Sequence, residues 1–213
     1  MQTNLINPLG PKLILASRSP RRVELLTLVG ARFTTFPVDV DESALPGERP
    51  DAHVQRLAEA KARAAAQACG QGGYGADDAQ DSVVVGADTI VSLDRVILGK
   101  PSGPDEAARM LERLSGRIHE VWTGLFLLDP GAGRGIGGAL RSIVKFAPLG
   151  PDDVARYVAT GEPLDKAGAY AVQGRGAVFV EAIEGSYSNV VGLPLSYLKH
   201  LLELLVQRPA ERT

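Results

Sequence analysis

The chain has 213 residues, enough for one large domain or two small lobes around a real core. Its 23 Lys and Arg and 25 Asp and Glu give a formal net charge of −2, which argues against bulk binding to nucleic acid or to a membrane surface. The one cysteine, Cys69, excludes an intramolecular disulfide and a cysteine-based zinc site. The sequence contains no signal-peptide pattern and no apolar run as long as a membrane span, so we expect a cytoplasmic protein.

The segment LILASRSPRR at residues 13–22 predicts a buried strand that runs directly into a helix. Its apolar start suits a strand covered on both faces, and Pro20 suits the first helical position because its missing N–H would have no partner there. We expect Ser19 as the N-cap of a helix over 20–29 and Gly30 as its C-cap. The turn gathers hydroxyl, backbone N–H and guanidinium groups, which suits a bound anion. The alternative is a capped helix with solvated arginines.

Acidic residues follow two predicted strands. A strand over 33–40 ends in the stretch VDVDES at 38–43, and a buried strand over 82–85 leads to Asp88. An isolated buried carboxylate is very costly, so Asp88 should emerge at the carboxyl end of its strand. If the strands are parallel, that end lies beside the anion-binding turn, at the edge where open α/β sheets bind ligands.

The whole pattern alternates strands with helices, which predicts an α/β fold with a mixed sheet and flanking helices. The other predicted elements are a helix from an Asp51 cap to about Cys69, a glycine-rich mobile loop over 70–81, a hairpin over 90–98 that turns at 93–95, a helix over 104–114, strands over 120–128 and 140–146 joined by a long loop, a helix over 151–159, a structured loop over 160–174, a strand over 177–183 and a helix over 194–206.

The stretch GRGIGG at 133–138 matches a dinucleotide-binding pattern. A strand and not a helix is predicted after it, so we interpret it as a hairpin tip.

Two lysines strengthen the case for a phosphate site. Lys61 falls on the apolar face of its helix, and Lys100 sits in the rigid GKP loop at 99–101. A lysine on an apolar face can instead carry its ammonium group out to solvent. Carboxylates and cations that face each other across a cleft are expected where both bind a common ligand. Phosphate groups together with Mg²⁺ are the simplest ligand that satisfies both kinds of side chain. The residues alone therefore predict a metal-dependent enzyme that acts on a phosphorylated small molecule.

Ordered motifs along residues 13–205 resemble those of the Maf-like nucleoside triphosphate pyrophosphatases. These motifs are ASRSPRR, DES after the second strand, EAKA, VGADTIV, GKP, LSGR with the following TG, TGEPLDKAGAY, VQG and VVGLPL. The resemblance implies a fold similar to the inosine-triphosphate pyrophosphatases, with two lobes around a central cleft, and a homodimer. We expect a single domain over 13–206, between an N-terminal extension over 1–12 and a C-terminal tail over 207–213.

The resemblance implies hydrolysis of a nucleoside triphosphate to the monophosphate and pyrophosphate, with a divalent metal such as Mg²⁺ or Mn²⁺. It implies Asp88 as the catalytic acid or base, and Glu42 together with Asp88 as the metal ligands. The residues that it implies in phosphate binding are Ser17, Arg22, Lys61 and Lys100. Those that it implies in substrate choice are Arg21, Thr89 and Gln173.

The motif set resembles the branch of the family that acts on dTTP and UTP, rather than the relative that acts on 7-methyl-GTP. An amide such as Gln173 carries a donor and an acceptor, which pair with the O4 acceptor and N3–H donor shared by uracil and thymine. Cytosine presents the reverse pattern and would leave both groups unpaired. The alternative role of Gln173 is to brace its own loop. Ala171, where the family usually has glycine, adds a methyl group near this amide.

Two other functions stay open at this point. The first is a pyrophosphatase whose true substrates are modified nucleotides, with dTTP and UTP merely accepted. The second is a nucleotide-binding regulator of cell division with little turnover. Direct binding to DNA is disfavoured, because the net charge is near zero and the sequence has no basic stripe.

Overall fold

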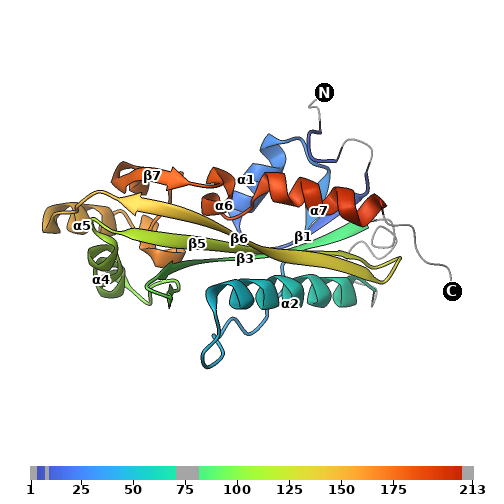
Figure 1. Ribbon diagram of the computed structural model, residues 1–213, viewed down its shortest axis with the longest axis horizontal. Helices are drawn as coiled ribbons and strands as arrows, with labels where there is room; N and C mark the ends of the chain where they lie inside the picture. The colour runs from blue at the N-terminus through green and yellow to red at the C-terminus, as the bar shows by residue number, and fades with distance from the viewer. Residues whose placement is uncertain (1–3, 8–9, 71–81, 208–213) are drawn as a thin grey trace.

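A mixed β-sheet runs along the length of the protein in the computed structural model, which describes residues 4–7, 10–70 and 82–207 (Figure 1). The strands of these residues are β1 (Lys12–Ala16), β2 (Phe33–Thr35), β3 (Ser82–Leu93), β4 (Val96–Leu98), β5 (Ile118–Asp129), β6 (Arg134–Phe146) and β7 (Val180–Glu184). Their order is β2-β1-β3-β5-β6-β7, and β4 also pairs with β3. β1 is parallel to β2 and β3, whereas the other pairs are antiparallel. The predicted mixed sheet is confirmed.

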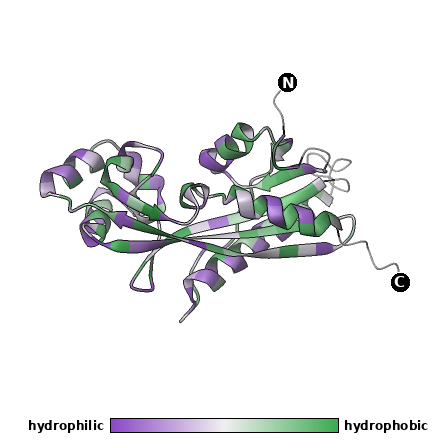
Figure 2. Cartoon of the chain, turned by 45° about the horizontal axis from the view of Figure 1, so that its top comes forward, coloured by the Kyte–Doolittle hydropathy of each residue, from purple (hydrophilic) through white to green (hydrophobic). Residues whose placement is uncertain are grey.

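Helices cover both faces of this sheet. They are α1 (Pro20–Leu28), α2 (Pro50–Gly70), α4 (Pro104–Leu114), α5 (Pro151–Val158), α6 (Tyr187–Val191) and α7 (Leu195–Gln207). α2 lies along one face and α1, α6 and α7 on the other, while α4 and α5 pack at the far end (Figure 1). One hydrophobic cluster contains Leu26 of α1 and Leu198 of α7, and another contains Leu111 of α4 and Phe146. The long strands therefore connect two lobes, and Figure 2 shows hydrophobic stretches along these strands alternating with polar ones.

One edge of β3 is shared by two shorter strands. β5 pairs with one edge of β3 from Val84 to Ser92. On the other edge, β1 pairs with residues 82–86 and β4 with residues 91–93. Residues 87–90 lie between the segment of β3 that pairs with β1 and the segment that pairs with β4. The sheet therefore has an opening beside residues 87–90 on this edge.

Two glycines let α2 lie directly on the sheet. A Cβ atom on Gly86 would lie 2.0 Å from the carbonyl oxygen of Ala58, and one on Gly124 would lie 2.0 Å from that of Val54. No side chain separates the helix backbone from the strands at these points. This close packing holds Lys61, about one turn after Ala58, against β3.

β3 extends far beyond the strand predicted over 82–85. It runs to Leu93, so the expectation that Asp88 follows the end of its strand is wrong. Antiparallel pairing with β5 supplies backbone partners as far as Ser92, and pairing with a distant strand leaves no signal in the local sequence. Asp88 is nevertheless not an unpaired buried carboxylate, because Lys61 is its cationic partner.

β6 begins earlier than predicted. It starts at Arg134, whereas the sequence predicted a loop over 129–138, so most of GRGIGG is strand and not a hairpin tip. A Cβ atom on Gly135 or on Gly137 would come within 2.7 Å of the ring of Phe126. The aromatic ring therefore covers two glycines that a strand would otherwise disfavour.

Two other strands are shorter than predicted. β2 ends at Thr35 instead of residue 40. Pro37 has no N–H to continue the ladder. β7 begins at Val180 instead of residue 177, because Arg175–Phe179 forms a 3-10 helix.

α1, α4, α5 and α7 have the predicted bounds to within one residue, whereas the caps differ and α6 was not predicted. Ser19 holds the N-cap position of α1, but its side chain makes no capping hydrogen bond. Val29 is the C-cap, and Gly30, predicted at that position, follows it with a φ of +68°. α2 begins at Pro50, so Asp51 lies in its first turn and is not the cap.

Three remaining sequence predictions concern turns, loops and membrane spans. The hairpin turn predicted at 93–95 is confirmed, with φ of +53° at Asp94 and +65° at Arg95. The loop predicted over 70–81 lies outside the described residues, except for Gly70 at the end of α2. In the described part of the chain, every helix is too short or too polar to cross a membrane.

We expect His119 to make the folded protein less stable in mild acid. Its side chain is buried, its Nε2 lies 2.9 Å from Tyr170 Oη, and its ring packs against Phe146. Burial lowers the pKa of this imidazole from 6.5 to about 4. Between these values the unfolded chain binds a proton that the folded protein does not bind. The stability contributed by the neutral imidazole is therefore complete above about pH 6.5 and is lost as the pH falls toward 4.

Urea denaturation near pH 7.5 and near pH 5 tests the prediction for His119. This residue should account for about 2 kcal/mol of the unfolding free energy lost between the two conditions. His119→Gln should lose about that much less than the wild type, whereas His200→Gln, at an exposed position, should behave like the wild type. Equal losses in the wild type and in His119→Gln would show that another group is responsible.

Candidate active site

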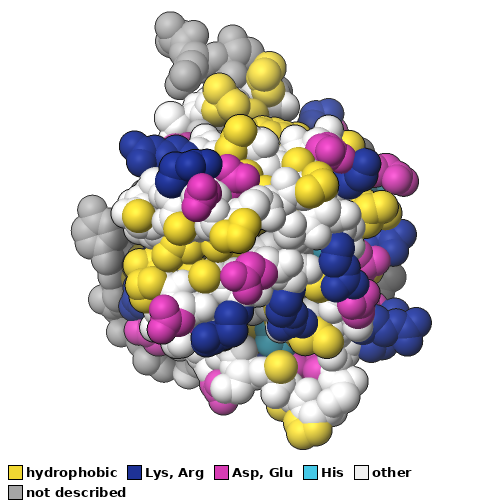
Figure 3. All heavy atoms as spheres, turned by 90° about the vertical axis from the view of Figure 1, so that its left-hand side faces the viewer, with side chains coloured by type: hydrophobic (Ala, Val, Ile, Leu, Met, Phe, Trp, Pro, Cys, Tyr) yellow, Lys and Arg dark blue, Asp and Glu magenta, His cyan; other side chains and the backbone are white. Residues whose placement is uncertain are grey.

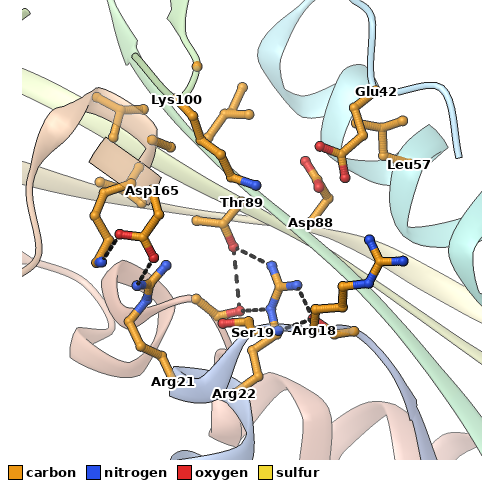
Figure 4. A pocket seen from close by; sticks show the side chains of 18 of the residues that line it. Arg18, Ser19, Arg21, Arg22, Glu42, Leu57, Asp88, Thr89, Lys100 and Asp165 are labelled. Atoms are coloured by element: carbon orange, nitrogen blue, oxygen red, sulfur yellow. Dashed lines mark hydrogen bonds and ion pairs between the residues drawn. The ribbon is translucent and has the colours of Figure 1, made fainter. Parts of the chain in front are cut away.

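The opening in the sheet at residues 87–90 borders a cleft of about 760 Å³. Its walls come from the turn between β1 and α1, the loop before α2, α2 itself, the segment after β4 and residues around 165–173. All nine residues predicted for the site line this cleft: Ser17, Arg21, Arg22, Glu42, Lys61, Asp88, Thr89, Lys100 and Gln173. Figure 4 shows how most of them point toward a common space.

A buried lysine holds two carboxylates on one side of the cleft. Lys61 Nζ lies 2.7 Å from Asp88 Oδ1 and 2.5 Å from Glu42 Oε1. Lys61 and Asp88 are each 8% exposed, so the alternative in which the ammonium group reaches solvent is wrong. Partial burial opposes ionisation of Glu42, but the hydrogen bond and charge of Lys61 outweigh it and lower the pKa of this carboxyl. The Glu42 carboxylate is therefore ionised at neutral pH.

Arg22 organises the turn between β1 and α1. Its Nη1 donates to Ser17 Oγ at 2.9 Å, and its Nη2 donates to Thr89 Oγ1 at 3.0 Å. Its Nε donates to the carbonyl oxygen of Gly192 at 2.8 Å. Burial lowers the pKa of this guanidinium, and the charge of Asp88 opposes that shift. Arg22 thereby fixes two hydroxyl groups, those of Ser17 and Thr89, in the wall of the cleft.

Further cations line the cleft from separate elements. Arg21, on α1, has its Nη1 4.0 Å from Asp165 Oδ2, and Lys166 also contacts Asp165. Lys100 follows β4 and points into the cleft from the side opposite α1 (Figure 4). The cleft is therefore cationic on more than one side, which suits an anion with several charges.

Gln173 lies at the rim of the cleft, between the 3-10 helices Ala167–Ala169 and Arg175–Phe179. Its side chain is exposed and has no hydrogen-bond partner among the described residues. This lack of a partner in the described part of the chain does not support the alternative in which the amide braces its own loop. The amide instead borders a space that a ligand can enter.

Several contacts in the cleft were not predictable from the sequence. Arg18 forms a two-pronged ion pair with Asp39, with N–O distances of 2.7 and 2.8 Å. The carbonyl group of Gly192 binds Arg22, and Asp165 sits beside the cations of α1. The motifs TGEPLDKAGAY and VVGLPL contain Asp165 and Gly192. Nothing in those motifs indicates that they fold back onto the first turn of the chain.

The carboxylates fit a metal ion that takes most of its ligands from a substrate. Glu42 and Asp88 converge on one ammonium group. Among the described residues, no group of three His, Cys, Asp or Glu side chains is arranged to hold an ion. Mg²⁺ is commonly held by one or two carboxylates together with waters and phosphate oxygens. The donor set therefore suits an ion that is shared with a polyphosphate, and not a closed structural site.

The protein is an α/β protein whose cleft combines clustered cations with a lysine-bound pair of carboxylates, an arrangement that suits a small polyanion. Comparison with known protein families identifies the family within this class. The family described as Maf-like protein matches residues 12–205, and the chain belongs to this family. The resemblance seen in the motifs is confirmed.

Similar proteins cover nearly the whole chain. The dTTP/UTP pyrophosphatase of Moorella thermoacetica is 50% identical over 194 residues, which are 91% of this chain and 94% of that protein. The dTTP/UTP pyrophosphatase of Pseudoalteromonas atlantica is 47% identical over 190 residues, 89% of this chain and 95% of that protein. The structure of the Staphylococcus aureus Ham1 protein matches with a TM-score of 0.51 and 13% identity, covering 91% of this chain and 99% of that one. That likeness concerns the fold alone.

Proposed function

We propose that this protein hydrolyses dTTP and UTP to the nucleoside monophosphate and pyrophosphate. The observation that carries the proposal is the arrangement of Asp88 and Glu42 on Lys61, in the same cleft as the arginine turn. Relatives that are 47–50% identical over most of the chain bear the name dTTP/UTP pyrophosphatase, which supports this choice of substrates.

In the proposed reaction, Asp88 takes a proton from the attacking water. Its Oδ1 is bound to Lys61, and its Oδ2, without a hydrogen-bond partner in the described residues, is free to accept from water. The water oxygen bonds to the α-phosphorus, and the bond from that phosphorus to the departing pyrophosphate oxygen breaks in line with it. Lys100 and the arginines of the turn bind the charge that develops on the leaving group.

Glu42 and Asp88 would hold a divalent cation, Mg²⁺ or Mn²⁺. When bound, the ion supplies polarisation of phosphate oxygens and neutralises part of their charge. Lys61 keeps the two carboxylates close together, since their like charges would otherwise repel each other.

Gln173 is the residue that we propose to read the base. Its amide can pair with the O4 acceptor and N3–H donor of uracil and thymine, a pattern that cytosine reverses. Arg21 and Thr89, which the family resemblance implies in substrate choice, line the same cleft.

The proposal includes a homodimer in the cytoplasm, without a nucleic-acid or membrane partner. Large hydrophobic side chains are exposed at Ile118, Leu164 and Val178, which supports contact between two copies of the chain. On the face shown in Figure 3, positive and negative side chains are interspersed. That face offers no single-sign patch to a nucleic acid.

Pyrophosphate release by the purified protein tests the proposal. We expect the highest kcat/KM for dTTP and UTP in a panel that also contains CTP, dATP, GTP and 7-methyl-GTP, with Mg²⁺ or Mn²⁺ present. A clear preference for 7-methyl-GTP or another modified nucleotide would overturn the choice of substrate. Nucleotide binding without turnover of any member would favour the regulator of cell division instead.

A further inference from the structure

The backbone on both sides of Gln173 is held by two residues outside the predicted site. Tyr157 lies on α5, and Glu162 begins a 3-10 helix, Glu162–Asp165. We call residues 171–176 the Gln173 turn. Neither Tyr157 nor Glu162 lines the cleft, so neither touches a ligand there directly.

Tyr157 and Glu162 bind the Gln173 turn through its backbone N–H groups. Tyr157 Oη accepts a hydrogen bond from the N–H of Ala171 at 3.2 Å and donates to Glu162 Oε1 at 2.8 Å. The carboxylate of Glu162 also accepts from the N–H groups of Arg175 at 3.0 Å and Gly176 at 3.2 Å. One connected pair of side chains therefore fixes the turn both before and after Gln173.

Packing leaves this arrangement little freedom. Tyr157 is 4% exposed, and its ring meets Phe179 edge to face at 5.0 Å between centroids. A Cβ atom on Gly174 would lie 2.4 Å from Glu162 Oε1, so the turn lies directly on the carboxylate. Partial burial opposes ionisation of Glu162, but the N–H group of Arg175 and the Tyr157 hydroxyl outweigh it and lower the pKa of this carboxyl. Glu162 is therefore an ionised acceptor at neutral pH.

The backbone of the turn is fixed, whereas the amide of Gln173 has no partner among the described residues. An amide that recognises a base by hydrogen bonding benefits from a fixed backbone, because that backbone is already ordered before the ligand binds. We propose that Tyr157 and Glu162 are positioning residues that set the base specificity of the cleft by holding the Gln173 turn. This inference rests on the proposed function, since it concerns discrimination between uracil or thymine and cytosine.

A purely structural brace would give a different result. Loss of such a brace would lower stability and would change the kinetics of all nucleotides alike. A positioning role predicts instead a change in the ratio of kcat/KM for UTP to that for CTP. The ratio is measured on one protein sample, so a smaller folded fraction cancels out of it.

Tyr157→Phe is the first variant, because it removes the hydroxyl and keeps the buried ring. We expect the ratio for UTP over CTP to fall about tenfold, the effect of about one net hydrogen bond, mainly through a higher KM for UTP. Tyr197→Phe, on α7 and outside the cleft, removes a tyrosine hydroxyl elsewhere and should leave the ratio unchanged. An unchanged ratio in Tyr157→Phe would overturn the inference.

Gly174→Ala is a second variant that leaves the ring of Tyr157 in place. The φ of −107° at Gly174 suits alanine, so the effect would come from the added methyl group pressing on Glu162. We expect the same loss of discrimination as in Tyr157→Phe. Wild-type discrimination in Gly174→Ala would count against the role of Glu162.

Gln173→Ala completes a double-mutant cycle. If Tyr157 acts through Gln173, then Tyr157→Phe should not lower the ratio further once Gln173 is alanine. Independent, additive losses would overturn the inference while leaving the proposed function intact. Failure of the wild type to hydrolyse UTP would overturn the proposed function first, and the inference with it.

Discussion

Replacing Asp88 with asparagine is expected to lower kcat for dTTP by about 10²- to 10⁴-fold. The amide is nearly the same size as the carboxyl group, and Lys61 keeps Glu42 as a partner at 2.5 Å, so the fold should survive. The amide, however, is far too weak a base to accept the proton of an attacking water. KM for the nucleotide should not rise when the metal is saturating, because the change removes negative charge from a site that binds a polyanion.

Steady-state pyrophosphate release and circular dichroism on the same samples would measure the effect of Asp88→Asn. Asp94→Asn is the matched control, since it is the same change in the exposed turn that follows β3. Its φ of +53° also suits asparagine, so that variant should keep full activity. A folded Asp88→Asn protein with wild-type kcat would show that another group takes the proton.

Replacing Gly86 with alanine is expected to lower the free energy of unfolding by about 3 kcal/mol. The new Cβ atom would lie 2.0 Å from the carbonyl oxygen of Ala58 and 2.8 Å from the backbone nitrogen of Ala62. Backbone atoms of a helix cannot rotate out of the way, so α2 must shift off the sheet. Because α2 carries Lys61, the protein that remains folded should also be less active.

Urea denaturation followed by circular dichroism would measure the stability of Gly86→Ala. Gly103→Ala is the control, because a Cβ atom there meets no other atom within 4 Å and the φ of 175° is extended. That variant should keep wild-type stability to within about 0.5 kcal/mol. Equal midpoints for Gly86→Ala and the wild type would contradict the close packing of α2 on β3.

Local sequence signals were enough to predict most of the helices. Pro20, Pro104 and Pro151 each stand at the first position of a helix, where a missing N–H leaves no bond unmade. The helix predicted over 104–114 has those bounds in the structure. These signals work because a helix makes its backbone hydrogen bonds within a few residues of itself.

The extents of the strands were predicted less well. β3 continues through Asp88 because β5, more than thirty residues later, pairs with it. β6 includes Gly135 and Gly137 because the ring of Phe126, on the neighbouring strand, covers them. A strand takes its hydrogen bonds and its packing from another part of the chain, so its own residues cannot show where it stops.

The chemical types of the site residues, and the family that they indicate, were determined by the sequence alone. Which of these residues touch was decided by the tertiary structure. Lys61 and Asp88 are 27 residues apart, and Arg22 and Gly192 are 170 apart, yet each pair is hydrogen-bonded. Glu162 lies within the TGEPLDKAGAY motif, but nothing in the sequence indicates that it and Tyr157 hold the Gln173 turn. Contacts of this kind depend on how helices and strands pack, and a local pattern of residues reports only the structure of its own segment.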